Sequence, residues 1–487
     1  MAASANHATN GAATVNGELS DSGYRNHVII FPFMAKSHTL PLLHFATLLS
    51  AHHSGLHVTV LTTPANLAFA RAHLPDSVRL VALPFPSLPS LPAGVESTDA
   101  LPSMSLYLTF LRATTLLRDP FAAFMASLQS SPPPLVLVSD FFLGFTHAVA
   151  AGAGVRRVVY HGMSCFSMAI CKSLAASPPR QQDGVGEPFH VSRMPGHVTI
   201  TEEEVPSALA KLADADDPMT RFLIEDVGVS DVRSWGVLVN SFAAVDGDFV
   251  AAVESFYDDG ARAWLVGPLL PAADDTSERD EEGCLAWLDE RAPGSVVYVS
   301  FGTQAHVTDE QLDELARGLV QSGHPFLWAV RSDTWSPTVE VGPDVGHIVR
   351  GWVPQRSVLA HESVGGFVSH CGWNSTLESL VAGKPVLAWP MIAEQHLNAK
   401  YVVDVVGTGE RVNSGGSGAV VGRTEVEEKI RRLMDADGEA GQRMRARAAW
   451  AQQAARSAVS DGGTSLVAVE TLVEELQKSY GVVDKSK

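Results

Sequence analysis

The chain has few cysteines, and their spacing limits the kinds of site that they can build. Only four are present in 487 residues, and no two of them form a Cys-x-x-Cys pair. This scatter argues against a structural zinc site, and the low number argues against a disulfide framework. Both features are typical of a protein from a reducing compartment. The four residues are Cys165, Cys171, Cys284 and Cys371.

Long apolar runs are also missing. No uninterrupted apolar stretch approaches the length that crosses a membrane. The first 25 residues are rich in Ala, Ser, Asn and Gly and lack the apolar core of a signal peptide, so we interpret them as a disordered leader. We therefore expect a soluble cytoplasmic protein without membrane insertion.

Positive charge is scarce. The sequence contains 35 Lys and Arg against 54 Asp and Glu, which gives a formal net charge of −19. No basic patch offsets this excess, and this argues against nucleic acid and anionic membranes as partners. The composition is otherwise that of a globular protein, with 46% hydrophobic residues and enough apolar material for two domains.

Glycine is absent from the first loop. Residues 27–33 form a near-continuous apolar run, as a buried parallel strand does, and a loop at 34–38 precedes a helical pattern from Thr39. Because this loop has no glycine, the Gly-x-Gly-x-x-Gly fingerprint is missing and an NAD-type dehydrogenase is disfavoured. Strands and helices then alternate, which predicts a doubly wound α/β sheet.

A second alternation of strands and helices begins at residue 296, after an acidic run that we interpret as a solvated linker. Two such series predict an α/β protein of two doubly wound, Rossmann-like domains. The expected limits are a leader at 1–25, an N-terminal domain at 26–267, a linker at 268–292, a C-terminal domain at 293–465, and a C-terminal helix and tail at 466–487.

Residues 352–395 contain the pattern of an anion site. An apolar strand at 366–369 runs into a turn at Gly372, and a helix is expected to begin near Asn374 or Ser375. Backbone N–H groups at such a helix start bind phosphate, and glycine lets the ligand come close to the backbone. From these residues alone a structural alternative stays open, since Ser375-x-x-Glu378 is also a capping box.

Residues 352–395 as a whole closely resemble the signature box of plant family-1 UDP-glycosyltransferases, and sparser matches extend the resemblance from about residue 27 onwards. The resemblance implies the GT-B architecture, in which two facing domains bind the acceptor (N-terminal) and the UDP-sugar (C-terminal). Members that end the box in Gln mostly use UDP-glucose, so Gln395 implies a glucosyltransferase. Many members have Asp where Glu394 stands, which we treat as a mild variation.

The resemblance also implies a role for each residue of the box. A flat indole suits a base, a carboxylate suits two vicinal hydroxyls, and neutral donors suit a diphosphate. The implied contacts are the uracil (Trp352 and the backbone of Val353), the ribose (Gln355, Glu378), the diphosphate (His370, Gly372, Asn374, Ser375) and the sugar (Trp373, Glu394, Gln395), with Thr303 as a further donor contact.

A general base is also needed, and histidine is the natural choice near neutral pH. His38 follows the first strand and Asp140 ends the strand at 135–140, so the two could meet at one edge of a sheet. From the residues alone His38 is one of 18 histidines, and His147 and His161 are rivals. The resemblance implies that His38 is the base and Asp140 its orienting acid.

Aromatic side chains near Asp140 suggest an apolar acceptor pocket. In some family members a threonine in the loop after the fourth strand touches the sugar; the loop at 161–164 of this chain has no threonine, and Ser164 is a candidate substitute. Flavonoids, other phenolics, terpenoids and hormones are all compatible acceptors, reached by inverting transfer of glucose to a hydroxyl. The candidate pocket residues are Phe141, Phe142, Phe145, Ser164 and Phe166.

No metal and no cofactor are expected beyond UDP-glucose as co-substrate. The two Asp-x-Asp patterns, at 214–216 and 435–437, lie in polar stretches that we interpret as solvated surface. We expect a monomer. A sugar-nucleotide epimerase or hydrolase of the same fold and a non-catalytic receptor for a small ligand stay open as alternatives.

Overall fold

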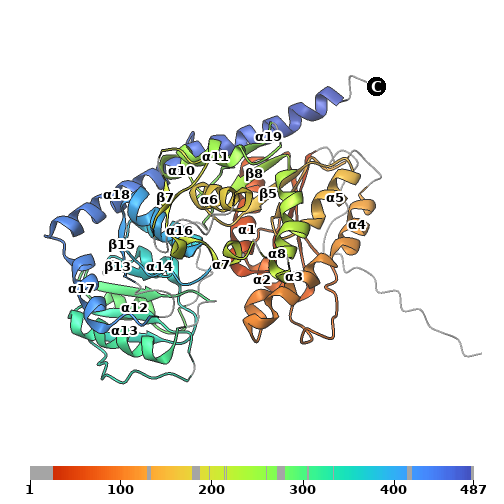
Figure 1. The fold of residues 1–487 in the computed structure, drawn as a ribbon. Helices are drawn as coiled ribbons and strands as arrows, with labels where there is room; N and C mark the ends of the chain where they lie inside the picture. Colours follow the sequence, from red (N-terminus) through yellow and green to blue (C-terminus); the bar gives the residue numbers. More distant parts are fainter. Residues whose placement is uncertain are drawn as a thin grey trace, which may run out of the picture. The chain divides into compact units, whose positions relative to one another are not determined.

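The computed structural model describes most of the chain as two compact units (Figure 1). The described residues are 26–128, 133–177, 187–196, 198–212, 214, 216–258, 260–270, 280–303, 307–332, 334–413 and 419–483. The expected leader, the middle of the expected linker and the last tail residues lie outside them. The first unit comprises Met1–Tyr160, Ile224–Gly236 and Val473–Lys487, and the second comprises His161–Leu223 and Val237–Leu472. The expected domain limits stay predictions.

The first unit is built on parallel strands with helices between them. The strand order begins β3(Arg79–Ala82), β2(His57–Thr62), β1(His27–Phe31), β4(Val136–Asp140), β5(Arg157–His161). Every residue of β1 and β4 is buried, because helices cover both faces of the sheet and no face is left for polar residues. β1 and β4 are direct neighbours, so their carboxyl ends lie side by side.

Helix α1 (Lys36–His52) begins earlier than predicted. The expected start at Thr39 is wrong, because the carbonyl of Ala35 already accepts the N–H groups of His38 and Thr39. His38 therefore lies in the first helical turn and not in a loop. Ala35 is extended and offers no capping side chain, so no residue type marked this start in the sequence.

The second unit contains a six-stranded parallel sheet. Its order is β12(Gly346–Val349), β11(Phe326–Ala329), β10(Val296–Ser300), β13(Val364–Ser369), β14(Val386–Ala388), β15(Gly409–Arg411). Helices α13 (Asp309–Ser322) and α17 (Arg423–Met434) lie side by side and bury one face of the sheet (Figure 1). Helices α12 (Cys284–Asp289) and α14 (Gln355–Ala360) cover the other face. The predicted doubly wound arrangement is confirmed here.

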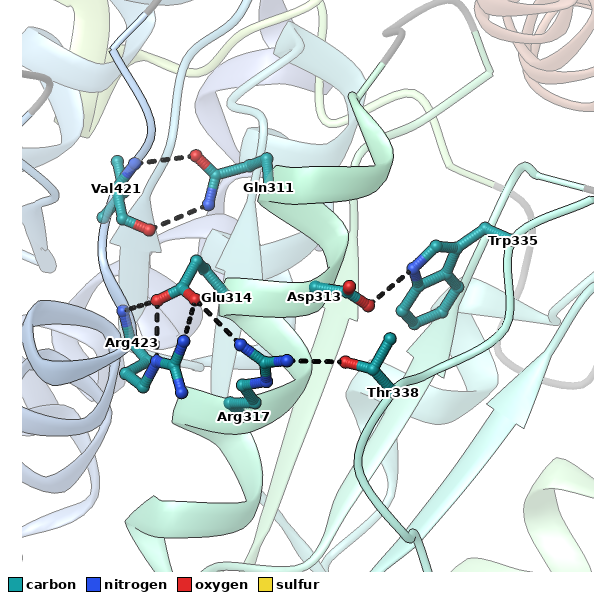
Figure 2. Close-up of polar contacts among 8 residues, drawn as sticks. All are labelled: Gln311, Asp313, Glu314, Arg317, Trp335, Thr338, Val421 and Arg423. Atoms are coloured by element: carbon teal, nitrogen blue, oxygen red, sulfur yellow. Dashed lines mark hydrogen bonds and ion pairs between the residues drawn. The ribbon is translucent and has the colours of Figure 1, made fainter.

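The polar face of α13 holds two neighbouring loops (Figure 2). Gln311, which is 8% exposed, exchanges two hydrogen bonds with the backbone of Val421, one as donor (3.0 Å) and one as acceptor (2.8 Å). Glu314 accepts hydrogen bonds from the backbone and the guanidinium of Arg423, and Asp313 accepts from the indole of Trp335. These contacts join α13 to the start of α17 and to the loop after β11.

The remaining elements lie between and after these strands along the chain. The helices are α2(Leu67–Ala72), α3(Tyr107–Thr115), α4(Arg118–Ser127), α5(Phe145–Gly152), α6(Cys165–Ala176), α7(Ser207–Ala210), α8(Pro218–Arg221), α9(Val229–Val232), α10(Ala243–Asp246), α11(Val250–Glu254), α15(Trp373–Ala382), α16(Gln395–Lys400), α18(Glu439–Ala458) and α19(Thr464–Val483). Short 3-10 helices are η2(Pro64–Asn66), η3(Thr98–Ala100), η4(Met104–Leu106), η5(Glu202–Glu204) and η7(Gly247–Phe249), and π-helices are η6(Phe222–Gly228) and η8(Tyr401–Val406). Further strands are β6(Phe189–His190), β7(Thr199–Ile200), β8(Gly236–Val239) and β9(Arg262–Leu265).

None of the helices among the described residues has the length and apolar character required to cross a membrane.

Helix α6 packs with α10, α11 and α16 inside the second unit. The buried carboxylate of Asp246 accepts the N–H groups of Cys165 and Phe166 at 2.6 and 3.1 Å and so caps α6. The hydroxyl of Tyr401 donates to the carbonyl of Val245 at 2.7 Å. These contacts join α6 and η8 to the same helix, α10.

Candidate functional site

The predicted anion site is a tight turn between β13 and α15. Cys371 has a φ of 62°, a left-handed conformation that is unusual for a residue other than glycine. Gly372 is the N-cap of α15 and makes no side-chain cap hydrogen bond. Ser375 therefore lies inside the first turn, and the capping-box interpretation is wrong. The helix starts at Trp373, so backbone N–H groups of its first turn are available for an anion.

The ring of His370 lies close to Gly302, which follows β10, and to Gly372, which follows β13. A Cβ atom on Gly302 or on Gly372 would lie 2.6 Å from the Nε2 atom of His370, so only glycine fits at both positions. Burial lowers the pKa of His370 to about 4, and the ring is neutral at pH 7. Among the described residues its buried Nδ1 atom has no hydrogen-bond partner. A phosphate oxygen would satisfy such a neutral donor.

The predicted ribose residues already contact one another. The amide nitrogen of Gln355 donates to the hydroxyl of Ser375 at 2.9 Å and to the carboxylate of Glu378 at 2.7 Å. The amide oxygen of Gln355 accepts from the hydroxyl of Tyr298 at 3.1 Å. Burial raises the pKa of Tyr298, so this phenol keeps its proton and acts as the donor. Sequence analysis did not identify Tyr298. The feature that could have indicated it is a hydroxyl-bearing aromatic residue within a mostly apolar buried strand.

Trp352 and Val353 follow β12 at the same edge of the sheet. The side chain of Trp352 is 46% exposed, which leaves a large flat apolar surface for a base to stack on. Val353 is buried, so only its backbone groups could contact the base. Thr303 is exposed in the turn after β10, next to residues that the structure does not describe.

The three residues predicted to bind the sugar differ in their burial and in their contacts. The indole N–H of Trp373 donates to the carbonyl of Asn240 at 2.8 Å, and its ring is 2% exposed, so this side chain is part of the core. The amide oxygen of Gln395 accepts from the N–H groups of Met391 and Ile392, which leaves its amide nitrogen as a donor for a sugar hydroxyl. Glu394, beside it, is partly buried.

His38 and Asp140 meet in the first unit, as predicted from their strand ends. The Nδ1 atom of His38 lies 2.7 Å from Oδ2 of Asp140, and Oδ1 of Asp140 accepts the N–H of Phe142 at 3.0 Å. The carboxylate is fully buried, whereas the His38 side chain is 20% exposed. Because Nδ1–H donates to the carboxylate, the neutral ring carries its lone pair on Nε2, as a general base requires.

Arg157 supports this strand end and was missed by sequence analysis. Its guanidinium, buried at 2% exposure, donates to the carbonyl of Asp140 at 3.0 Å and to the hydroxyl of Ser139 at 2.8 Å. The only signal was a charged residue at the start of an apolar strand. The rival histidines have other contacts: His147 bonds the carbonyl of Arg233 at 3.1 Å, and His161 bonds the hydroxyl of Tyr257 at 3.2 Å.

Two of the five candidate pocket residues lie beside His38. The ring centroids of Phe141 and Phe142 are 6.4 and 5.7 Å from that of His38. Phe145 instead packs edge-on against Phe31 in the first unit. In the second unit, Phe166 is 1% exposed and packs against Phe249 and Tyr401, and the hydroxyl of Ser164 caps α6 by accepting the N–H of Ser167.

The two Asp-x-Asp patterns form local turns. Asp214 accepts the N–H of Asp216, and Asp435 accepts the N–H groups of Asp437 and Gly438; residue 215 lies outside the described part of the chain. Within the described residues, no group of three or more His, Cys, Asp or Glu side chains has the arrangement of a metal site.

Comparison with known proteins identifies the family. The sequence model described as "UDP-glucoronosyl and UDP-glucosyl transferase" matches residues 269–431, and that described as "Glycosyltransferase, N-terminal domain" matches residues 26–271. The chain is 39% identical to UDP-glycosyltransferase 90A1 of Arabidopsis thaliana, over 95% of this chain and 98% of that protein. It is 35% identical to scopoletin glucosyltransferase of Nicotiana tabacum, over 92% and 98% of the two chains.

A solved structure agrees with these sequence relatives. The crystal structure of UGT73P12 from Glycyrrhiza uralensis, complexed with glycyrrhetinic acid 3-O-monoglucuronide, superposes with a TM-score of 0.82 at 30% identity. The match covers 94% of this chain and 97% of that one. This similarity confirms the GT-B fold. The chain belongs to the plant UDP-glycosyltransferases and is an enzyme of that family.

Proposed function

We propose that the enzyme transfers glucose from UDP-glucose, with inversion, to a hydroxyl group of a small apolar or phenolic plant metabolite. The observation that carries this proposal is the 2.7 Å hydrogen bond between His38 and the buried Asp140. It fixes the ring so that Nε2 accepts a proton, and Phe141 and Phe142 give that nitrogen an apolar surrounding.

In the proposed reaction the acceptor oxygen attacks the anomeric carbon of the glucose. The hydroxyl proton passes to Nε2 of His38, and Asp140 stabilises the resulting imidazolium. The bond between the anomeric carbon and the diphosphate oxygen breaks, and UDP leaves with both bonding electrons. The N-terminus of α15 and the neutral donors His370, Asn374 and Ser375 stabilise the charge that develops on the diphosphate.

The donor preference rests on the sugar end of the site. Gln395 keeps an amide nitrogen for a sugar hydroxyl, and Glu394 beside it accepts hydroxyl hydrogens. The name of the tobacco relative, scopoletin glucosyltransferase, supports glucose as the sugar and a hydroxylated aromatic as one acceptor to test. All four cysteines are free, which supports action in a reducing compartment such as the cytoplasm. We further propose a monomer, which size-exclusion chromatography checks.

The direct experiment incubates the enzyme with UDP-glucose and a panel of acceptors that includes scopoletin, and detects products by mass spectrometry. We expect UDP and one equivalent of a glucoside. Free glucose without acceptor would identify a hydrolase, and a UDP-sugar isomer would identify an epimerase. Binding of aromatic ligands without any release of UDP would identify a receptor, and each of these three results would overturn the proposal.

A further inference from the structure

Asn398 lies in α16, three residues after Gln395, and its side chain connects three parts of the second unit. It is fully buried. Its amide nitrogen donates to the carbonyl of Cys371 at 2.9 Å and to the carboxylate of Glu394 at 3.3 Å. Its amide oxygen accepts from the hydroxyl of Ser167 on α6 at 2.7 Å. One side chain therefore contacts the turn between β13 and α15 (residues 370–372, the anion turn), Glu394 at the sugar end of the proposed donor site, and helix α6.

The chemistry of these partners fixes the orientation of the Asn398 amide. The carbonyl of Cys371 and the carboxylate of Glu394 can only accept, so the nitrogen must face them. The hydroxyl of Ser167 can donate, so the oxygen faces it. A flipped amide would place its oxygen against two acceptors in a buried site, which is costly.

The bond to Cys371 stabilises the turn before α15. A left-handed residue other than glycine costs about 1–2 kcal/mol, so Cys371 needs contacts that hold it at a φ of 62°. Its N–H donates to the hydroxyl of Ser369 at 3.1 Å, and its carbonyl accepts from Asn398. Both backbone groups of this residue are thus held by side chains. Gly372, the N-cap of α15, follows directly, so these two bonds determine where the helix start points.

The bond to Glu394 orients the other end of the site. Glu394 precedes α16 and lies one helical turn before Asn398, whose amide nitrogen holds its Oε1 atom. Ala393, just before it, is also left-handed, with a φ of 54°. This bond restricts the rotamers open to the Glu394 carboxylate.

We propose that Asn398 is a positioning residue of the donor site. Its amide fixes the position of the anion turn relative to the Glu394 carboxylate, and Ser167 orients this amide. Asn398 does not touch the donor; it acts through Cys371 and Glu394. This inference rests on the proposed function, because it assigns the diphosphate to the turn and the sugar to Glu394.

The main variant is Asn398→Asp, which keeps the size and the bond from Ser167 but replaces two donors with a charged oxygen that repels Glu394. We expect kcat/KM for UDP-glucose to fall about 10- to 100-fold, the usual loss when a residue that orients a ligand-binding group is changed. By calorimetry, the affinity for UDP-glucose should fall more than that for UDP, because Glu394 contacts only the sugar.

Gln311→Glu is the matched control. It makes the same amide-to-carboxylate change in a buried side chain of the same unit, opposite the backbone of Val421 (Figure 2). It should lower the melting temperature and leave the ratio of UDP-glucose to UDP affinity unchanged. If Asn398→Asp also lowers only the melting temperature, Asn398 is merely structural and the proposal is overturned.

Ser167→Ala decides the question if Asn398→Asp does not fold. It removes only the hydroxyl that orients the amide, so a smaller loss in the same direction is expected, and unchanged UDP-glucose affinity would overturn the proposal. Wild-type enzyme that binds UDP-glucose without transferring glucose would contradict the proposed function, while the variants' affinities would still decide the role of Asn398. Wild-type enzyme that does not bind UDP-glucose would overturn both.

Discussion

Both carboxylate oxygens of Asp140 are occupied by groups of its own unit. One binds His38 and the other binds the N–H of Phe142, so the carboxylate cannot rotate away from the imidazole. The carbonyl of Asp140 is held in turn by Arg157. His38, the proposed base, is therefore oriented before any substrate binds, which lowers the reorganisation needed during proton transfer.

His38→Ala should lose roughly 10²–10⁴ in kcat, the usual contribution of general base catalysis, and keep near-native affinity for UDP. Asp140→Asn should lose less if the ring keeps its place, and the double variant should be scarcely worse than His38→Ala because the two act as one unit. Rates with an alcohol and with an already ionised nitrophenol check this, since the nitrophenol needs less base. If His38→Ala retains most of its rate on the alcohol, the base lies elsewhere.

We assign Gln395 a structural contact and a proposed sugar contact, which one substitution can separate. Its amide oxygen holds the loop through Met391 and Ile392, whereas its amide nitrogen is left for the sugar. Gln395→Glu keeps the acceptor and removes the donor, so it should cost about 1–3 kcal/mol in transition-state stabilisation with UDP-glucose, without loss of UDP affinity. Gln395→Ala should lose loop stability as well. Equal rates of Gln395→Glu and wild type with UDP-glucose would contradict the sugar contact.

His370, a proposed diphosphate contact, also affects stability at acid pH. Its pKa of about 4 in the folded state is below the usual 6.5, so the unfolded chain binds more protons between these values. The contribution of His370 to the free energy of unfolding is therefore full above about pH 6.5 and is lost as the pH falls toward 4. Between pH 7 and pH 5 this loss is about 2 kcal/mol. His370→Gln should show a smaller fall in melting temperature over that range. An equal fall in both proteins would contradict the burial of a neutral ring.

Helix starts were the least predictable elements. The strands β1, β4, β10 and β13 and the pairing of His38 with Asp140 follow from apolar runs and strand ends in the sequence. The starts of α1 and α15 do not, because their N-caps are Ala35 and Gly372, which have no capping side chain. Sequence rules search for Ser, Thr, Asp or Asn at this position, and both helices begin earlier than those rules indicate.

The position of the α15 N-cap predicts the effect of replacing Ser375. Because Gly372 is the N-cap, Ser375→Ala removes a donor-site hydroxyl and its contact with Gln355 but no helix cap. The KM for UDP-glucose should rise about fivefold for the loss of roughly 1 kcal/mol, with little change in melting temperature. Glu378→Gln should likewise weaken the binding of UDP-glucose. Lower stability with unchanged kinetics would contradict a role of Ser375 in donor binding.

Neither unit is a continuous piece of sequence, and this limits what the sequence can predict. Two series of strands and helices suggest a cut near residue 268, yet α6 and its neighbours group with the second sheet. The contacts responsible, such as those of Asp246 and Tyr401, join residues far apart in the chain. No local pattern reveals them, since each is one polar group among many in an apolar surrounding.

Metal independence is a prediction about the whole enzyme. Asp214 and Asp435 each accept N–H groups of their own turns, and the diphosphate is assigned to a helix start and neutral donors. Added EDTA should leave the rate nearly unchanged. A large loss that Mg²⁺ or Mn²⁺ restores would show that a metal ion binds the diphosphate.

The correct folding of the donor site in a chimera with another family member depends on the contacts within the second unit. A junction near residue 268 would take Asn240, Val245 and Ser167 from one parent and their partners Trp373, Tyr401 and Asn398 from the other. The first two contacts use backbone carbonyls as acceptors, which any residue provides. Of these three contacts, only Ser167 with Asn398 requires both side chains, so this pair must be matched for the grafted donor site to keep its shape.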